Sequence, residues 1–264
     1  MSTKNIFLSL IIPCYKQEKI IIANLKQISK VLRKTRYTYE IIVVIDGHVD
    51  ESFYKIKNTL LHNVTAYEYK DNRGKSFAIR YGMSKSKGSN VMFLDSGMEI
   101  DPDGISMLLE HMKWYNADAI VGSKRHPVSQ VNYTLQRKIL SYGYYYMVKL
   151  LFGLKITDTQ AGIKVFKKDV LTKVLPRLVE KRFAGDLEML VVARHLGYSR
   201  VFEAPIKLDY QLSDWSTASS WRQIVGILLD TLAIFYRKNI AKYYNRSRRR
   251  FVKPRGKIKK VVHK

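Results

Sequence analysis

The sequence VMFLDSGME at residues 91–99 decides the fold of this chain and contains its first candidate site. Four apolar residues in a row, Val91 to Leu94, predict a strand that is buried on both faces. Asp95, a Ser-Gly turn and Glu99 follow this strand. Ligands of open α/β sheets bind beyond the carboxyl ends of the strands, and hard divalent cations prefer oxygen ligands. The stretch therefore predicts a metal site at the sheet edge, although an acid pair taken alone is more often a solvated turn.

Predicted strands and helices alternate on both sides of this stretch. Apolar runs at residues 7–12, 40–45 and 64–69 predict three further strands, each of which ends in a polar or glycine turn. Helical spacing covers residues 18–35, 51–61, 76–86, 105–115, 134–153, 186–196 and 221–236, and a strand is expected at 119–122. The alternation predicts an α/β fold with three layers, in which helices cover both faces of a mostly parallel sheet.

Composition excludes several classes of protein. The 264 residues are 46% hydrophobic, which fits a folded domain and not a disordered chain. The single Cys14 excludes an internal disulfide, and we see no secretory signal, so we expect a reducing, cytoplasmic compartment. No apolar run approaches the roughly 20 residues that span a bilayer.

The charge of the chain implies an anionic partner. Its 47 Lys and Arg residues and 22 Asp and Glu residues give a formal net charge of +25. Residues 237–264 hold 13 of these cations and no acid, so they are predicted to form a flexible basic tail. Nucleic acid, a phosphorylated small molecule and an acidic membrane surface all fit this charge.

Five short motifs together carry a resemblance to a known family. They are IIPCYKQE at 11–18, IVVIDGHVD at 42–50, NRGKS at 72–76, VMFLDSGME at 91–99 and DTQAGIKVF at 158–166. The chain resembles family 2 glycosyltransferases with the GT-A fold over roughly residues 7–236. It is most similar to the dolichyl- or polyprenyl-phosphate sugar synthases. That branch implies an inverting transfer of a hexose from GDP-mannose or UDP-glucose to a polyprenyl or dolichyl phosphate, with Mg²⁺ or Mn²⁺.

The resemblance implies a donor site that the chemistry of its residues supports. A nucleotide needs an aromatic edge and carboxylates for base and ribose, and its diphosphate needs cations. The residues matched to nucleotide-sugar binding are Pro13, Tyr15, Glu18, Asp46, Lys75 and Asp95. The family has a second Asp where this chain has Gly97. We expect Asp95 and Glu99 to share the metal, so that Glu99 replaces the missing carboxylate.

The resemblance implies that cations bind the acceptor. A lipid phosphate is already ionised near neutral pH, so it needs positioning cations and no general base. Lys124 and Arg125 follow Gly122 and Ser123, and this stretch resembles the family's G-S-R motif. Arg137 lies four residues before Ser141, so the two share one face of a predicted helix. The residues expected to act in catalysis are Asp95, Glu99 and Arg137. Those expected to line the acceptor side or to support the structure are Asp158, Gln160, Asp186 and Glu188.

We expect one catalytic domain at residues 1–236, with a nucleotide-sugar half at 1–122 and an acceptor half at 123–236. The aromatic helices at 134–153 and 221–236, with the basic tail, predict peripheral attachment to an anionic membrane surface. A chain of this branch without a spanning helix must meet its lipid in this way or through a membrane-spanning partner subunit.

Three alternatives remain open at this point. The acceptor could be a hydroxyl group of a lipid-linked saccharide, but the Arg137 and Ser141 pair favours a phosphate. A nucleic-acid-binding module is disfavoured, because the chain lacks an aromatic RNA-binding pattern and the five motifs would go unexplained. An inactive relative that serves as a partner subunit is the third alternative, and Gly97 is its marker.

Overall fold

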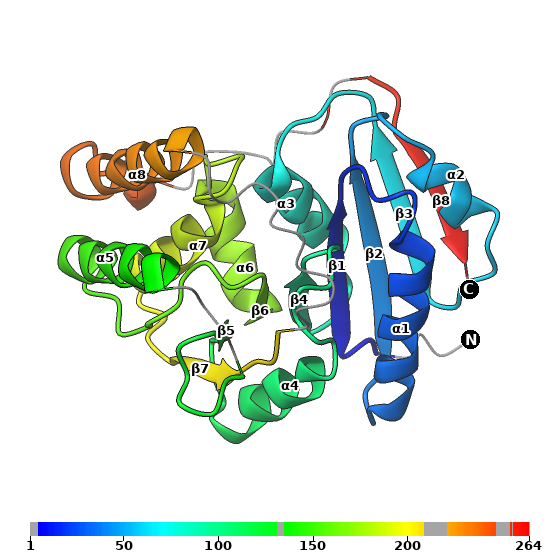
Figure 1. Ribbon diagram of the computed structural model, residues 1–264, viewed down its shortest axis with the longest axis horizontal. Coiled ribbons are helices and arrows are strands. Elements are labelled where there is room, and N and C mark those ends of the chain that lie inside the picture. The colour runs from blue at the N-terminus through cyan, green and yellow to red at the C-terminus, as the bar shows by residue number, and fades with distance from the viewer. Residues whose placement is uncertain (1–4, 131–134, 209–220, 247–253, 255, 264) are drawn as a thin grey trace.

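The computed structural model describes residues 5–130, 135–208, 221–246, 254 and 256–263 (Figure 1). In this part of the chain the strands form one sheet with the order β7-β5-β6-β4-β1-β2-β3-β8. Helices lie against both faces of the sheet, so the predicted three-layer α/β architecture is confirmed.

The first half of the sheet is parallel. Its strands are β1 (Leu8–Cys14), β2 (Tyr39–Asp46), β3 (Val64–Tyr69) and β4 (Asn90–Leu94). β1 pairs with both β2 and β4, and β2 pairs with β3. All five residues of β4 are buried, as the continuous apolar run predicts. Asp95 comes directly after β4, so the stretch that decides the fold lies at the centre of the sheet.

The helices divide between the two faces. One core contains apolar residues of α1 (Ile21–Lys34), α2 (Ser52–Lys57) and α4 (Gly104–Trp114). The other contains residues of α3 (Lys75–Lys85), α5 (Leu135–Phe152), α6 (Lys168–Val174), α7 (Gly185–His195) and α8 (Trp221–Phe235). α1 faces the sheet because Ile21, Leu25, Ile28 and Leu32 recur at helical spacing and are buried.

The second half of the sheet contains an antiparallel strand that the sequence analysis does not predict. β6 (Ile163–Lys167) lies between β4 and β5 (Ala119–Ser123) and runs antiparallel to both. β7 (Val201–Pro205), also not predicted, pairs in parallel with β5. β6 is hard to recognise because Lys164 interrupts its apolar run, although this side chain is fully buried.

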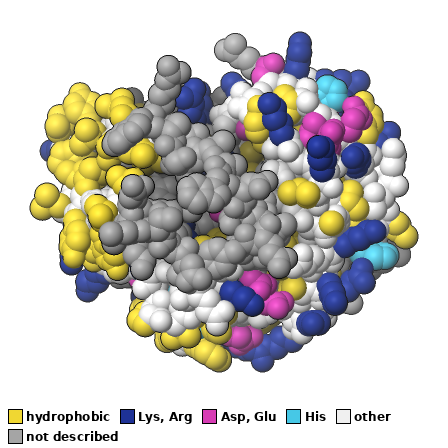
Figure 2. All heavy atoms as spheres, in the orientation of Figure 1, with side chains coloured by type: hydrophobic (Ala, Val, Ile, Leu, Met, Phe, Trp, Pro, Cys, Tyr) yellow, Lys and Arg dark blue, Asp and Glu magenta, His cyan; other side chains and the backbone are white. Residues whose placement is uncertain are grey.

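α5 and α8 expose apolar side chains on one side of the molecule. Tyr144 Oη and Thr231 Oγ1 lie 3.2 Å apart and link the two helices. The space-filling view shows an apolar surface over them (Figure 2). Its exposed members are Ile139, Leu140, Tyr142, Tyr146 and Leu150 on α5, and Val225, Leu229 and Leu232 on α8. Within the described ranges, no helix combines the length and apolar character needed to cross a membrane.

Parts of the expected basic tail, residues 237–264, form secondary structure within the described ranges. A π-helix, η2 (Tyr236–Ile240), continues α8 and is followed by a 3-10 turn, η3 (Tyr243–Asn245). Further on, β8 (Lys259–His263) pairs antiparallel with β3. The open edge of β3 offers backbone partners, and Lys259 Nζ lies 2.9 Å from the buried Glu68 Oε2.

Candidate active site

Asp95 stands at the end of β4 and is held from two sides. Its backbone N–H donates to the Gly162 carbonyl at 3.0 Å, and its Oδ2 accepts from Lys75 Nζ at 2.8 Å. Its other oxygen, Oδ1, is buried and has no hydrogen-bond donor among the described residues. A Cβ on Gly162 would lie 2.2 Å from Oδ2, so only glycine leaves room for this carboxylate. Gly162 of the fifth motif therefore makes room for Asp95 of the fourth motif.

Lys75 begins α3, directly after a glycine turn. Gly74 has a φ of 96°, which favours glycine, and its backbone lies close to the Lys181 carbonyl. Burial by itself would lower the pKa of the Lys75 ammonium. The carboxylates of Asp95, Asp186 and Glu99 outweigh burial, so its pKa is raised above the ordinary value for lysine. Lys75 is thus a stable cation at the N-terminus of a helix, an arrangement suited to phosphate oxygens.

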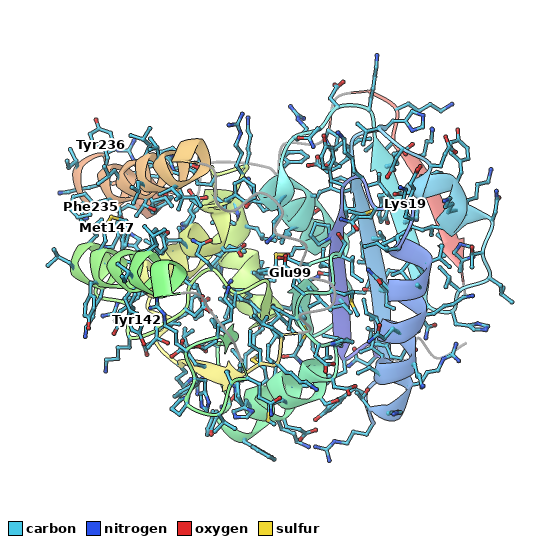
Figure 3. The ribbon with its side chains drawn as sticks, in the orientation of Figure 1. Lys19, Glu99, Tyr142, Met147, Phe235 and Tyr236 are labelled. Carbon is cyan, nitrogen blue, oxygen red and sulfur yellow. The ribbon has the colours of Figure 1, made fainter. Side chains whose placement is uncertain are left out.

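A pocket of about 70 Å³ joins the donor and acceptor sides of the predicted site. Asp95 and Glu99 line it together with Lys124 and Gln160, and Gly162 forms part of its wall. Figure 3 shows Glu99 near the centre of the molecule, between the two halves of the sheet. Two carboxylates that follow β4 and a lysine that follows β5 therefore line the same pocket.

A buried ion pair between β6 and α7 is a feature that the sequence does not predict. Lys164 Nζ donates to the Ala161 carbonyl at 2.6 Å and lies 3.3 Å from Asp186 Oδ2. Burial lowers the pKa of Lys164, while the charge of Asp186 opposes this shift. The pair connects β6 to α7, and Lys164 lies two residues after Gly162 in the sequence. The signal in the sequence is a lysine inside the apolar run of the fifth motif.

The predicted nucleotide contacts lie at the ends of β1 and β2. Pro13 is buried within β1, and Tyr15, which follows the strand, is 42% exposed. Glu18 and Asp50 hold these two loops together: Glu18 N donates to Asp50 Oδ2, and Glu18 Oε2 accepts from Glu51 N, each at 3.0 Å. The Tyr15 side chain is therefore accessible to solvent, and Glu18 fastens the loop beside it.

Asp46 is buried and holds the turn at residues 73–74 in place. It is 3% exposed, and its Oδ1 accepts from Tyr69 Oη and from Arg73 N, both at 2.7 Å. Its Oδ2 accepts from Gly74 N at 2.8 Å. The carboxylate that the sequence analysis matches to nucleotide binding thus anchors the turn that presents Lys75.

Two of the predicted acceptor-side residues, Arg125 and Ser141, contact each other. Arg125 donates to the Thr157 carbonyl at 2.8 Å and to Ser141 Oγ at 2.6 Å. Its guanidinium also lies 4.7 Å from the Tyr142 ring centroid and 5.0 Å from that of Tyr145. Ser141 is thus bonded to Arg125. Arg137 lies within α5, but its side chain falls outside the described residues.

Three of the remaining predicted residues take part in hydrogen bonds that shape loops. Asp158 accepts from the backbone N–H groups of Lys124 and Gln160, at 3.0 and 3.1 Å. Gln160 Nε2 donates to Tyr144 Oη at 3.1 Å and so links the pocket to α5. Glu188 is fully buried, and burial raises its pKa even though several donors contact it.

The donor set around Asp95 fits a divalent cation in part. The buried, unpaired Asp95 Oδ1 and the nearby Glu99 supply oxygen ligands of the kind that Mg²⁺ and Mn²⁺ prefer. No cluster of three or more His, Cys, Asp or Glu ligands occurs within the described ranges. A metal ion here would take its other ligands from a bound diphosphate and water, as Mg²⁺ commonly does.

A family model described as "Glycosyl transferase family 2" matches residues 9–175, well over half of the chain. The chain belongs to glycosyl transferase family 2. This match confirms the family suggested by the five motifs and agrees with the observed fold.

Two relatives of this family 2 chain show how far the similarity extends. The dolichyl-phosphate beta-glucosyltransferase of Drosophila melanogaster is 31% identical over 206 residues, which are 72% of this chain and 63% of that protein. The UDP-N-acetylglucosamine–dolichyl-phosphate N-acetylglucosaminyltransferase of Methanococcus voltae is 28% identical, covering 90% of this chain and 96% of that one. The chain thus spans less than two thirds of the length of the fly relative.

A solved structure supports the GT-A fold. Mannosyl-3-phosphoglycerate synthase from Rubrobacter xylanophilus superposes with a TM-score of 0.66 and 12% sequence identity, over 88% of this chain and 74% of that chain. At this identity the likeness concerns the fold alone.

Proposed function

We propose that this protein transfers a hexose, with inversion, from a nucleotide-sugar to a dolichyl or polyprenyl phosphate. One observation carries the proposal: Asp95 and Glu99 share a pocket with Lys124, and Lys75 contacts Asp95. Acids for a metal-bound diphosphate thus meet cations that suit an acceptor phosphate. The relatives named for transfer to dolichyl phosphate support the acceptor, and their different sugars leave the donor to experiment.

The chemistry requires positioning and charge neutralisation. An oxygen of the lipid phosphate attacks the anomeric carbon of the sugar while the bond to the nucleoside diphosphate breaks on the opposite face. The electron pair of that bond leaves with the diphosphate. No proton has to be removed from an ionised phosphate, so the site needs no general base. Lys75, with its raised pKa, remains charged and binds the diphosphate oxygens.

Asp95 and Glu99 are the residues that would hold a divalent cation. A bound Mg²⁺ or Mn²⁺ would neutralise the negative charge that builds on the leaving diphosphate. Lys75 Nζ contacts the other oxygen of Asp95, Oδ2, at 2.8 Å, and this leaves Oδ1 for a metal ion. Glu99 supplies the carboxylate that the family has two positions earlier, where this chain has Gly97.

On the acceptor side, Lys124 and Arg137 would contact the lipid phosphate. Arg125 lies against two tyrosine rings and holds Ser141, so it fixes the first part of α5 relative to the pocket. Asp158 fixes the backbone of Lys124 in the same way. These contacts support a rigid acceptor site on the side of the molecule that carries α5.

The apolar surface over α5 and α8 fits an anionic membrane as its partner. Leu150 is 87% exposed and Leu229 is 61% exposed, while Lys149 lies on α5, Lys238 lies in η2, which continues α8, and Lys242 follows η2. Figure 3 shows Tyr142 on α5 and Tyr236 at the start of η2, on the same side of the molecule. Apolar and aromatic side chains next to lysines are typical of surfaces that lie in a bilayer interface.

The deciding experiment measures sugar transfer with purified protein, dolichyl phosphate and Mn²⁺. UDP-glucose, UDP-N-acetylglucosamine and GDP-mannose are compared as donors, and a polyprenol without phosphate replaces the acceptor in the control. We expect transfer that requires the phosphate and ceases when EDTA is added. Transfer to the polyprenol control, or no transfer with any donor, would contradict the proposal.

Two variants separate the parts of the proposal. Arg137→Ala should abolish transfer to lipid phosphate and leave nucleotide binding intact, because it lies on the acceptor side. Leu229→Asp should lower sedimentation with vesicles that contain phosphatidylserine, while transfer to a short, soluble acceptor phosphate persists. Equal vesicle binding by Leu229→Asp and the unaltered protein would refute the membrane surface.

A further inference from the structure

The segment after α8 reaches from the outer surface of the molecule into its core. Tyr236 at the start of η2 is 55% exposed, whereas Tyr244 in η3 is fully buried. Arg177 Nε donates to the Tyr244 carbonyl at 2.9 Å, which fixes the backbone at this point. A basic segment that the sequence predicts to be flexible thus inserts an aromatic side chain into the folded domain.

Tyr244 and Arg237 meet two acids there. Tyr244 Oη donates to Glu188 Oε1 at 2.8 Å. Arg237 Nη1 lies 2.6 Å from Glu180 Oε1 and 3.5 Å from Glu188 Oε1. Burial alone would lower the pKa of Arg237, but its bonds to Tyr244 and Glu180 raise it, so this cation stays charged.

Glu188 links Tyr244 and Arg237 to the loop before α7. Its Oε2 accepts from Val179 N at 2.9 Å and from Glu180 N at 2.8 Å. Arg80 of α3 donates to the Glu180 carbonyl at 3.3 Å. The backbone of residues 179–180 is therefore held between the C-terminal segment and α3.

The next two residues of this loop touch the turn that carries Lys75. Phe77 N donates to the Lys181 carbonyl at 3.2 Å, and Ser76 Oγ donates to the Arg182 carbonyl. A Cβ on Gly74 would lie 2.4 Å from the Lys181 carbonyl oxygen, so loop and turn are in close contact. Any shift of residues 181–182 must move the first turn of α3.

We propose that Tyr244 and Arg237 are positioning residues for the donor diphosphate. They act through Glu188 and the 179–182 loop on the turn that carries Lys75. The Lys75 side chain in turn contacts Asp95. The inference rests on the proposed function, since it assumes that Lys75 binds the diphosphate. Loss of the Tyr244 hydroxyl should loosen the turn and weaken donor binding about tenfold, because small displacements of a binding group are costly.

The test uses the full chain with Tyr244→Phe, which keeps the buried ring and removes one hydroxyl. Tyr236→Phe is the matched control, because it removes an exposed hydroxyl from the same segment. Calorimetry measures the affinity for UDP and for GDP in the presence of Mn²⁺, and steady-state assays separate KM for the donor from kcat. We expect Tyr244→Phe to raise Kd and donor KM about tenfold with a small change in kcat, and Tyr236→Phe to change neither.

Hydrogen exchange adds a readout that does not depend on activity. The amides of Phe77, Val179 and Glu180 should exchange faster in Tyr244→Phe than in Tyr236→Phe, because their acceptors lie along the proposed connection. Arg237→Gln, which removes the cation that contacts Glu180, should also speed the exchange of these amides.

The outcomes distinguish the two proposals. If the unaltered protein binds nucleotide and Tyr244→Phe binds it equally well, with unchanged exchange at Phe77, the positioning role is refuted while the function stands. A Tyr244→Phe protein that only melts at a lower temperature, with donor KM unchanged, refutes it as well. If the unaltered protein binds neither nucleotide, the proposed function fails, and the role in donor binding fails with it.

Discussion

Gly162→Ala should disable the site by displacing Asp95. The new methyl group would lie 2.2 Å from Asp95 Oδ2 and 2.6 Å from its Cγ, so the carboxylate must move by about 1 Å to restore a normal contact. That movement breaks the 2.8 Å contact with Lys75 Nζ. Misplacement of this size costs about a hundredfold in rate, and overpacking should lower the free energy of unfolding by about 1–3 kcal/mol.

Gly97→Ala is the matched control, because a Cβ at Gly97 meets nothing within 4 Å. Both variants add one methyl group to the same rim. The assay measures kcat/KM for the donor with saturating dolichyl phosphate, together with the thermal midpoint of each variant. A Gly162→Ala protein with the same kcat/KM as Gly97→Ala would refute the argument that Gly162 makes room for Asp95.

Three further predictions concern the metal pair and the only cysteine. Glu99→Ala should abolish Mn²⁺-dependent nucleotide binding measured by calorimetry, whereas full binding would show that Asp95 needs no second carboxylate. Gly97→Asp should tighten Mn²⁺ binding about tenfold, since the position is open and adds a third acid; weaker binding would contradict this. Burial raises the pKa of Cys14 to about 12, above the ordinary value, so at pH 8 it stays a neutral thiol. It should react with Ellman's reagent only after unfolding, and rapid labelling of the native protein would count against the buried position.

The first half of the fold could be predicted because local pattern and tertiary structure agree there. The apolar run at 64–69 coincides with β3, and the other three parallel strands differ from the prediction by one or two residues at their ends. β6 could not be predicted in this way, because its buried Lys164 depends on Asp186, which comes 22 residues later. β8 is equally hidden, since its partner strand lies far away in the sequence.

The site was predictable in its residue types but less so in their individual tasks. A motif identifies Asp46 as an acid at a strand end, yet only its neighbours reveal that it accepts three hydrogen bonds from Tyr69 and the 73–74 turn. Helical spacing places Ser141 and Arg137 on one face of a helix, but it does not reveal that Ser141 accepts a hydrogen bond from Arg125, which lies on a different segment. Hydrogen bonds between distant segments decide such tasks, and periodicity carries no information about them.

The pairing of β8 with β3 also has a consequence for the order in which the chain folds during synthesis. Val64 pairs with His263, about 200 residues later, so the edge of β3 stays open until nearly all of this sequence has left the ribosome. An uncovered strand edge is a template for pairing with other chains. Translation that stops before residue 259 would therefore release a nascent protein with an exposed sheet edge, the kind of species that chaperones bind.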